Sequence, residues 1–250
     1  MPQASHRQPS LVGRLPELAA LDEIVRSVRR GGRLAVVEGE AGIGKTRLVE
    51  TAMETARGAG VAVLASRAEE LEAHRPFGAI LDCVGAERLD QHLGVWDLRP
   101  DAGGERQFRV AETVLELLDE LCARGPVVLA IEDLHWADPA TLGVLARVAA
   151  GLERLPAALV VSARPQPRRP ELERLLGVLA ARGATSVRLR PLDEGSSVEL
   201  LETLLDARPG ARLVRQAARG REPAVRERAR QRAAGGRRHR APRRRRRARE

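Results

Sequence analysis

Hydrophobic residues follow two alternating patterns along the chain: short continuous runs, and longer stretches with helical spacing. The run from Pro126 to Ile131 is apolar throughout and has turn signals at both ends, which is typical of a central strand in a parallel sheet. Between Glu105 and Arg124, apolar side chains recur every three or four positions and form one stripe of a helix. Because such strands alternate with such helices, the pattern predicts an α/β fold in which helices cover both faces of a parallel sheet. The expected strands are residues 33–38, 61–66, 126–131, 158–163 and 185–189, and the expected helices are residues 16–30, 45–57, 77–84, 105–124, 139–152, 170–182 and 196–205.

The same pattern weakens in three places and so outlines the domains. Residues 1–10 are polar, contain two prolines and are expected to be disordered. Residues 67–104 offer one helix, at 77–84, followed by a link punctuated by glycine and proline. Towards the end of the chain the apolar periodicity fades and arginine dominates. We therefore expect one α/β domain over residues 11–206 and a low-complexity, arginine-rich tail over residues 207–250.

A glycine-rich segment connects the first expected strand to the helix that follows it. Gly39–Thr46 reads GEAGIGKT and matches the P-loop pattern G-x-x-x-x-G-K-[ST] in the strand-to-helix context that this motif requires. Glycines let the backbone curl so that successive N–H groups face phosphate oxygens, and the helix N-terminus adds the positive end of its dipole. We expect Lys45 to reach the β- and γ-phosphates of ATP, and the Thr46 hydroxyl to coordinate Mg²⁺. The candidate nucleotide-binding residues of this segment are Gly39, Glu40, Ala41, Gly42, Ile43, Gly44, Lys45, Thr46 and Arg47.

Two carboxylates stand where the third expected strand ends. The apolar run continues directly into Glu132 and Asp133. In P-loop ATPases an acid at this position contacts Mg²⁺, and a neighbouring acid orients the attacking water. Most such motifs have aspartate first, whereas Glu132 comes first here. We expect Glu132 to join Thr46 as a magnesium ligand and both acids to be catalytic, but the sequence leaves the division of labour between the two acids open.

The next expected strand and the segment before it supply further candidates. Arg164 follows the strand at 158–163, where a cation could sense the γ-phosphate; the alternative is a solvated arginine at a strand end. Asp138 precedes a proline at a helix start and is expected to cap that helix. His135 and Trp136 are expected to pack beside the site.

The charge of the chain is unevenly distributed. The formal net charge is +9, but residues 211–250 hold 17 arginines and 3 glutamates, a net charge of +14, so the rest of the chain has a net charge of −5. The excess of positive charge therefore belongs to the tail. Lys45 is the single lysine among the 43 basic side chains, and it occupies the lysine position of the P-loop motif.

Cysteine usage and hydropathy exclude several classes of protein. Cys83 and Cys122 lie far apart and form no C-x-x-C pair, so we expect reduced thiols, with neither a disulfide nor a zinc site. The N-terminus lacks the apolar stretch of a secretory signal, and no apolar run approaches the roughly 18 residues that a membrane span needs. We expect a cytoplasmic protein that does not contact membranes.

Three segments together resemble a known group of regulatory ATPases. These are LVGR at Leu11–Arg14, GEAGIGKTRLVE at Gly39–Glu50 and EDLHWADPATL at Glu132–Leu142. They are similar to the STAND-type, AAA-like ATPase domains of large bacterial LuxR-family transcriptional regulators. The similarity spans about residues 11–206, and the DLHWAD segment is quite specific to this group.

The resemblance implies a P-loop NTPase fold with the sheet order 5-1-4-3-2 and with the nucleotide at the carboxyl ends of the strands. It implies an ATP/ADP switch with slow hydrolysis in place of rapid turnover. Self-association through the ATPase domain is a further expectation. It also implies that the segment containing Val12, Gly13 and Arg14 lies near the adenine, and that Arg164 takes the sensor role.

The arginine-rich tail departs from this family, whose members continue with Gly-Asn-Pro-Leu-Phe, a winged-helix region and a C-terminal helix-turn-helix. Residues 219–230, RGREPAVRERAR, permit codons that spell Gly-Gly-Gly-Asn-Pro-Leu-Phe-Val-Ser-Glu-Leu when read one nucleotide later. We therefore expect residues 219–250 to be an out-of-frame remnant of the winged-helix region, in the N-terminal fragment of a regulator that bound DNA through domains absent here. One alternative is a genuine basic arm, densest at residues 243–247, that binds DNA or RNA phosphates without aromatic residues for base stacking. Another is an inactive fragment.

Overall fold

The structure, a computed structural model, describes residues 11–93, 104–205 and 210. These residues belong to two compact units, Arg14–Arg190 and the combination of residues up to 13 with those from 191 onwards. The elements are α1 (Leu15–Ser27), η1 (Val28–Arg30), β1 (Arg33–Glu38), α2 (Lys45–Gly58), β2 (Ala62–Arg67), η2 (Glu70–Glu72), α3 (Gly78–Val84), α4 (Ala86–Leu93), α5 (Glu105–Cys122), β3 (Val127–Glu132), α6 (Pro139–Gly151), η3 (Leu152–Arg154), β4 (Ala157–Ala163), α7 (Pro170–Ala181), β5 (Thr185–Arg188) and α8 (Glu194–Leu205).

The larger unit is built on a five-stranded sheet in which every neighbouring pair of strands is parallel. Its order is β2-β3-β4-β1-β5, which is the expected order 5-1-4-3-2 counted from the other edge. Parallel neighbours cannot be joined by tight hairpins, so the chain crosses over through a helix after each of the first four strands. The α/β P-loop fold expected from the sequence is thereby confirmed.

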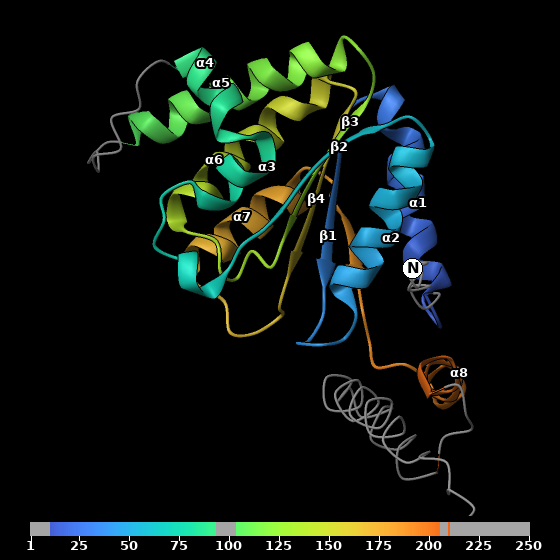
Figure 1. Ribbon diagram of the computed structural model, residues 1–250. Coiled ribbons are helices and arrows are strands. Elements are labelled where there is room, and N and C mark those ends of the chain that lie inside the picture. Colours follow the sequence, from blue (N-terminus) through green and yellow to red (C-terminus); the bar gives the residue numbers. More distant parts are fainter. Residues whose placement is uncertain (1–10, 94–103, 206–209, 211–250) are drawn as a thin grey trace, which may run out of the picture. The chain divides into compact units, whose positions relative to one another are not determined.

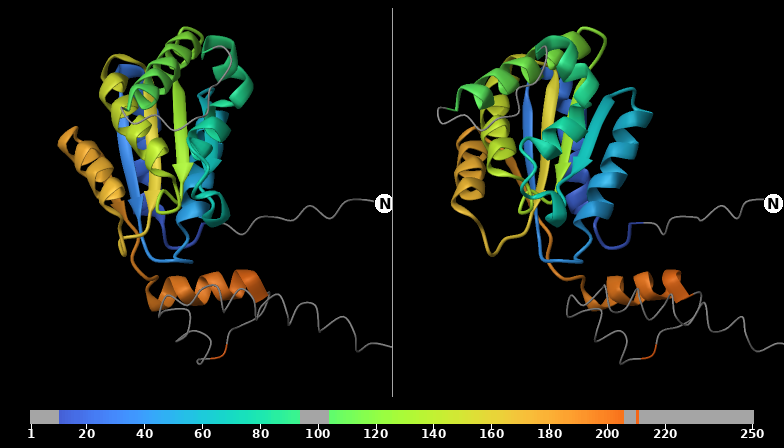
Figure 2. Two further views of the ribbon diagram at one scale, coloured as in Figure 1. Left: turned by 90° about the vertical axis from the view of Figure 1, so that its left-hand side faces the viewer. Right: turned by 60° about the vertical axis from the view of Figure 1, so that its left-hand side comes forward.

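Helices lie on both faces of this sheet (Figures 1 and 2). Helices α1 and α2 cover one face, and α3, α5, α6 and α7 cover the other. The central strands β3 and β4 are buried along their whole length because both of their faces are covered. This accounts for their continuous apolar sequences, since no face of these strands meets water.

Helix α4 was not predicted from the sequence, which indicated only a link punctuated by glycine and proline between residue 84 and Gly104. Helix α4 begins directly after Gly85, whose φ of 88° lies in the left-handed region. Its Leu89 is fully buried and belongs to the hydrophobic core. The helix is too short for its apolar spacing to stand out from a sequence rich in turn residues, so packing against the core, more than local preference, accounts for it.

Asp138 caps α6, as its place before Pro139 predicts. Its Oδ1 accepts hydrogen bonds from the backbone N–H of Thr141 at 3.0 Å and of Phe77 at 3.0 Å. Its Oδ2 accepts a hydrogen bond from the Thr141 hydroxyl at 2.5 Å. Asp138 is 4% exposed, so it joins the starts of α3 and α6 from a buried position.

Replacing Asp138 with alanine is expected to lower the free energy of unfolding by about 2–4 kcal/mol, because a helix cap is lost and buried donors lose their acceptor. Urea denaturation of the purified variant measures this loss. Asp119→Ala is the matched control, since Asp119 is exposed on α5 and is expected to change the stability by less than about 0.5 kcal/mol. Equal stability of the two variants would show that Asp138 is not a structural cap.

The smaller unit contains α8, which begins after Asp193. The carboxylate of Asp193 accepts hydrogen bonds from the backbone N–H of Ser196 at 2.8 Å and from its hydroxyl at 3.0 Å. Gly13 lies against Ser196 in this unit, and Val12 is buried. The disordered segment and most of the arginine-rich tail expected from the sequence lie outside the described residues.

Both cysteines are free thiols: Cys83 is buried and Cys122 is partly buried. Burial raises the pKa of the Cys83 thiol to about 12. Over the described ranges, no cluster of three or more histidine, cysteine or acidic side chains could hold a metal ion. None of the helices described is both long and apolar enough to cross a membrane.

Candidate nucleotide-binding site

The glycine-rich loop runs from the end of β1 to the start of α2 and is tightly curled. A Cβ atom on Gly39 would lie 2.7 Å from Cγ2 of Ile43 and 3.1 Å from Cβ of Leu189, so a larger residue would not fit without displacing them. Gly44 has a φ of 100°, a left-handed conformation that favours glycine. The side chain of Ile43 is buried and anchors the loop. The loop thus places the N-terminus of the 14-residue helix α2 at the carboxyl edge of the sheet.

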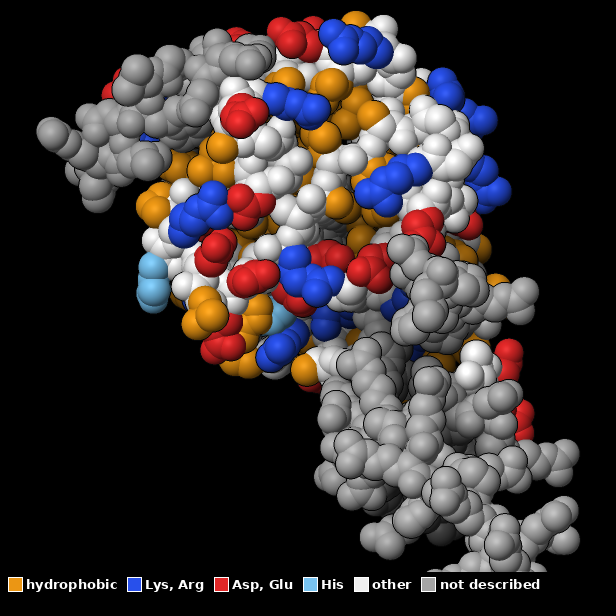
Figure 3. Space-filling view, in the orientation of Figure 1, with side chains coloured by type: hydrophobic (Ala, Val, Ile, Leu, Met, Phe, Trp, Pro, Cys, Tyr) orange, Lys and Arg blue, Asp and Glu red, His pale blue; other side chains and the backbone are white. Residues whose placement is uncertain are grey.

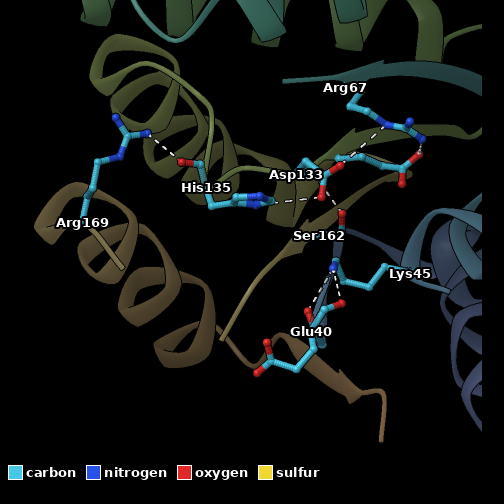
Figure 4. A network of polar contacts seen from close by, with 9 residues as sticks. Glu40, Lys45, Arg67, Asp133, His135, Ser162 and Arg169 are labelled. Carbon is cyan, nitrogen blue, oxygen red and sulfur yellow. Dashed lines mark hydrogen bonds and ion pairs between the residues drawn. The ribbon is translucent and has the colours of Figure 1, made fainter. Parts of the chain in front are cut away.

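Lys45, the first residue of α2, turns back over the loop (Figure 4). Its Nζ donates hydrogen bonds to the carbonyl oxygens of Gly39 at 2.9 Å and of Glu40 at 3.0 Å. Burial lowers the pKa of Lys45, the negative charge of Asp133 opposes this shift, and the positive charge of Arg164 adds to it. The ammonium group is therefore held above the loop, within electrostatic reach of the residues that follow β3 and β4.

Glu132, the last residue of β3, lies close to Thr46. Burial raises the pKa of Glu132, and the Thr46 hydroxyl, as a hydrogen-bond partner, partly opposes this rise. One carboxylate oxygen, Oε1, accepts a hydrogen bond from Arg67 at 3.4 Å. The other, Oε2, is buried and has no hydrogen-bond partner in the part of the chain that the structure describes. A hydroxyl beside a carboxylate with one unsatisfied oxygen fits the oxygen ligands that Mg²⁺ prefers.

Asp133 differs from Glu132 in its backbone and in its partners. Its φ of 57° is left-handed, a conformation that aspartate tolerates better than most residues and that turns the chain sharply as it leaves β3. Its backbone N–H donates to Ser162 Oγ at 3.0 Å, and the next N–H, of Leu134, donates to the Ser162 carbonyl at 2.8 Å. The Asp133 carboxylate consequently lies between Arg67 and His135, as Figure 4 shows.

Arg67 is a residue of this site that the sequence analysis did not identify. It ends β2 and lies opposite Glu132 in the register of β2 and β3. Besides its contact with Glu132, its Nε lies 3.8 Å from Oδ2 of Asp133. The sequence could have indicated Arg67 only through its position, because an arginine at the end of the strand next to β3 must lie beside the two acids. Identifying Arg67 in this way requires knowing that β2 and β3 are neighbours in the sheet.

The structure places Arg164 at the same edge of the sheet. Its guanidinium carbon lies 5.7 Å from the centre of the Trp136 ring, a cation–π contact, and its Nε is buried with no hydrogen-bond partner among the described residues. Its positive charge lowers the pKa of both Lys45 and His135. Arg164 therefore lies within electrostatic reach of the P-loop lysine.

Arg14 and Arg47 belong to the same unit as the P-loop. Arg14 is buried and donates from Nη2 to the Ile43 carbonyl at 3.2 Å, while its Nη1 lies 3.2 Å from Glu17 Oε1. Arg47 is half-buried in the first turn of α2. Val12 and Gly13 belong to the other unit, so their expected place beside the adenine remains a prediction.

The surface seen in Figure 3 carries acidic and basic side chains side by side around the lower part of the described domain, where the strands end in Figure 1. At the end of β1, the buried Glu38 carboxylate pairs with Arg168 and, at 3.3 Å, with Arg188. The candidate site thus lies at an edge of mixed charge.

The fold and this site define a P-loop ATPase domain, and comparison with known proteins places it in a family. The model of the AAA ATPase domain family, AAA_16, matches residues 10–161, more than half of the chain. The chain therefore belongs to the AAA_16 family of AAA ATPase domains. Members of this family typically bind ATP with Mg²⁺.

One curated relative is an uncharacterized protein of Rhizobium meliloti (strain 1021). It is 35% identical over 94 residues, which is 38% of this chain and 8% of the relative. The matched segment is thus a small part of a much longer protein. The match adds no known activity to the family assignment.

Several solved structures share the fold. The ORC1 protein of Aeropyrum pernix, solved in complex with DNA, is 20% identical and superposes with a TM-score of 0.62 over 94% of this chain and 64% of its own. Cdc6p of Pyrobaculum aerophilum is 18% identical, with a TM-score of 0.55 over 80% of this chain and 51% of its own. A Walker-type ATPase of Pyrococcus abyssi is 16% identical, with a TM-score of 0.55 over 88% and 65%. At these identities the likeness concerns the fold alone, and this chain spans about half to two thirds of each structure.

Proposed function

We propose that this domain binds ATP and ADP together with Mg²⁺ and hydrolyses ATP slowly. The observation that supports this most strongly is the position of Lys45. Its ammonium group lies above the P-loop and is electrostatically coupled to Asp133 and Glu132 across the carboxyl edge of the sheet. A phosphate chain placed on the loop would meet both the backbone N–H groups of the loop and the Lys45 ammonium.

Each residue has a role in this proposal. The backbone of Gly39–Gly44 and the N-terminus of α2 hold the β- and γ-phosphates, and Lys45 neutralises part of their charge. The Thr46 hydroxyl and the Glu132 carboxylate hold Mg²⁺, in keeping with their closeness and with the unsatisfied Oε2 atom. Bound Mg²⁺ supplies charge neutralisation between the phosphates. In this proposal Glu132 binds the metal ion, and Asp133 orients the water that attacks the γ-phosphate.

Asp133 and Arg164 act on the γ-phosphate side in this proposal. Asp133 is the more exposed of the two acids, with 24% side-chain exposure against 10% for Glu132, so a water can reach it. Arg164 projects from the end of β4 and, through its charge, senses whether a γ-phosphate is present. Its buried and unsatisfied Nε leaves a donor for that contact.

We further propose that the domain is a nucleotide-dependent switch within a LuxR-type transcriptional regulator. The segments LVGR and DLHWAD support this context, as described above. In that setting Val12, Gly13 and Arg14 lie near the adenine, and the domain self-associates in one nucleotide state. The contact of Arg14 with the Ile43 carbonyl supports a link between the start of α1 and the P-loop.

The test is the magnesium dependence of nucleotide binding. Wild-type protein is expected to bind ATP more tightly with Mg²⁺ than with EDTA, and Thr46→Ala is expected to lose about 10-fold of the affinity measured with Mg²⁺, because one ligand of the ion is removed. Titration with a fluorescent ATP analogue measures both affinities.

Thr51→Ala is the matched control for this variant. Thr51 lies on the same helix, and its hydroxyl donates to the Arg47 carbonyl at 2.8 Å, away from the proposed metal ligands. It is expected to leave the magnesium effect unchanged. The assignment of Thr46 fails if Thr46→Ala responds to Mg²⁺ as the wild type does, and nucleotide binding itself fails if the wild type shows no affinity.

A further inference from the structure

His135 is a buried polar side chain that the proposed site does not yet use. It follows Asp133 by two residues, and its side chain is 8% exposed. Neither ring nitrogen has a hydrogen-bond partner among the residues that the structure describes. Buried imidazole nitrogens are normally satisfied by protein or by ordered water. The expectation that His135 only packs beside the site does not account for an unsatisfied Nδ1 that faces Asp133.

The surroundings of His135 hold it in one place. Its backbone carbonyl accepts a hydrogen bond from Arg169 at 3.2 Å, and its ring lies 5.0 Å, centre to centre, from the ring of Trp136. The backbone N–H of Trp136 donates to the Asp133 carbonyl at 2.8 Å and closes a tight turn. His135 is therefore fixed relative to Asp133 by the backbone as well as by packing.

A gap separates the side chains of His135 and Asp133. Nδ1 of His135 lies 3.9 Å from Oδ1 of Asp133, as Figure 4 shows. This distance is too long for a direct hydrogen bond. One water molecule can contact both atoms across a gap of this size.

We propose that Oδ1 of Asp133 and Nδ1 of His135 bind one water molecule between them, and that this water attacks the γ-phosphate of ATP. The inference rests on the proposed function, since it concerns the hydrolytic half of that site. Lys45 is electrostatically linked to both residues that would bind this water. Its positive charge lowers the pKa of His135, and the negative charge of Asp133 raises the pKa of Lys45. The water site therefore lies within electrostatic reach of the group that would hold the γ-phosphate.

The protonation state of His135 agrees with this role. Burial lowers the pKa of His135 to about 4 even though Asp133 acts in the opposite direction, and the positive charges of Arg164, Lys45 and Arg169 lower it further. The ring is thus neutral near pH 7. With its proton on Nε2, Nδ1 is an acceptor. The water then donates one hydrogen bond to Asp133 and one to His135, and its lone pairs remain free.

The reaction balances without any further reactant. The water oxygen forms a bond to the γ-phosphorus, and the bond from that phosphorus to the bridging β,γ-oxygen breaks, its electron pair leaving with ADP. One water proton passes to the Asp133 carboxylate and is then released to solvent. His135 takes no proton in this step and acts by orienting the water.

Three substitutions of His135 in the full chain test the water site. His135→Phe keeps a ring of similar size without nitrogen, His135→Asn keeps a polar atom near the place of Nδ1, and His135→Gln keeps one near the place of Nε2. We expect His135→Phe and His135→Gln to lower kcat on the order of 10- to 100-fold, because the water loses one of its two acceptors. His135→Asn is expected to stay within about 3-fold of the wild type. Affinity for a non-hydrolysable ATP analogue with Mg²⁺ is expected to change less than about 2-fold in all three.

The measurements are phosphate release, analogue binding and thermal unfolding of each variant. A purely structural role for His135 predicts that Phe is tolerated, so an unchanged kcat in His135→Phe overturns the inference. So does a His135→Asn variant as impaired as His135→Phe while both unfold at the wild-type temperature. A wild-type protein that binds nucleotide but does not release phosphate overturns the water site and leaves nucleotide binding intact. A wild-type protein without nucleotide affinity overturns both.

Discussion

Replacing Lys45 with alanine is expected to weaken the binding of ATP by about 100-fold or more. The substitution removes the charged donor nearest to the proposed phosphate position, and charged hydrogen bonds of this kind contribute about 1.5–3 kcal/mol each. It also uncovers the carbonyls of Gly39 and Glu40, which then present negative dipoles to the phosphates. Isothermal titration of wild type and variant with ATP and Mg²⁺ measures the difference.

Two companions make this experiment specific. Arg57→Ala removes an exposed cation from the last turn of the same helix and is expected to leave the affinity unchanged. Lys45→Arg keeps the charge, but its planar guanidinium is broader than an ammonium, so we expect its affinity to stay closer to that of Lys45→Ala than to wild type. An affinity for ATP that is the same in wild type and Lys45→Ala would remove the central proposal.

Substitution of the two acids is expected to separate binding from hydrolysis. Asp133→Asn is expected to lower kcat by about 100-fold while the affinity for MgATP changes little, because the water loses the carboxylate that accepts its proton. Glu132→Gln is expected instead to raise the Mg²⁺ concentration needed for half-maximal activity, because it weakens a ligand of the ion. Phosphate release measured over a range of Mg²⁺ concentrations distinguishes the two effects.

The contacts in the structure motivate this division. Glu132 lies beside the Thr46 hydroxyl and has one unsatisfied buried oxygen, whereas Asp133 lies between Arg67 and His135. If Asp133→Asn shifts the Mg²⁺ requirement and Glu132→Gln does not, the two roles are exchanged. Both variants remove one charge from the same turn, so each serves as the control for the other.

Much of the fold could be predicted from the sequence, because local spacing reports burial. Strand β1 has the expected bounds, β2 and β3 begin and end one residue later than expected, and β4 and β5 differ from expectation by one residue at one end. The strands β3 and β4 were evident as apolar runs, since both of their faces are covered. Helix α4 was missed, because an eight-residue helix offers too few apolar positions for its spacing to stand out, although its Leu89 is fully buried.

The residues of the candidate site likewise fall into those that the sequence could identify and those that only the structure shows. The P-loop could be found as a motif because its residues are contiguous and each residue type answers a local need of the turn. Arg67 could not be found in this way, because its contact with Glu132 joins residues 65 positions apart and depends on β2 and β3 being neighbours. His135 was visible in the sequence, but the role that we propose for it rests on an unsatisfied Nδ1 and a 3.9 Å gap that only coordinates show.

By itself, then, the sequence determined the alternation of strands and helices, the P-loop and the identity of the two acids, since each of these depends on neighbours within a few residues. The tertiary structure alone decided how the acids differ. The left-handed turn at Asp133, held by Ser162 on the adjacent strand, directs that carboxylate towards Arg67 and His135, while Glu132 stays on the strand beside Thr46. Two adjacent and chemically similar residues thereby acquire different surroundings, because side-chain environment is set by the strands and loops packed around a residue and not by its neighbours in the chain.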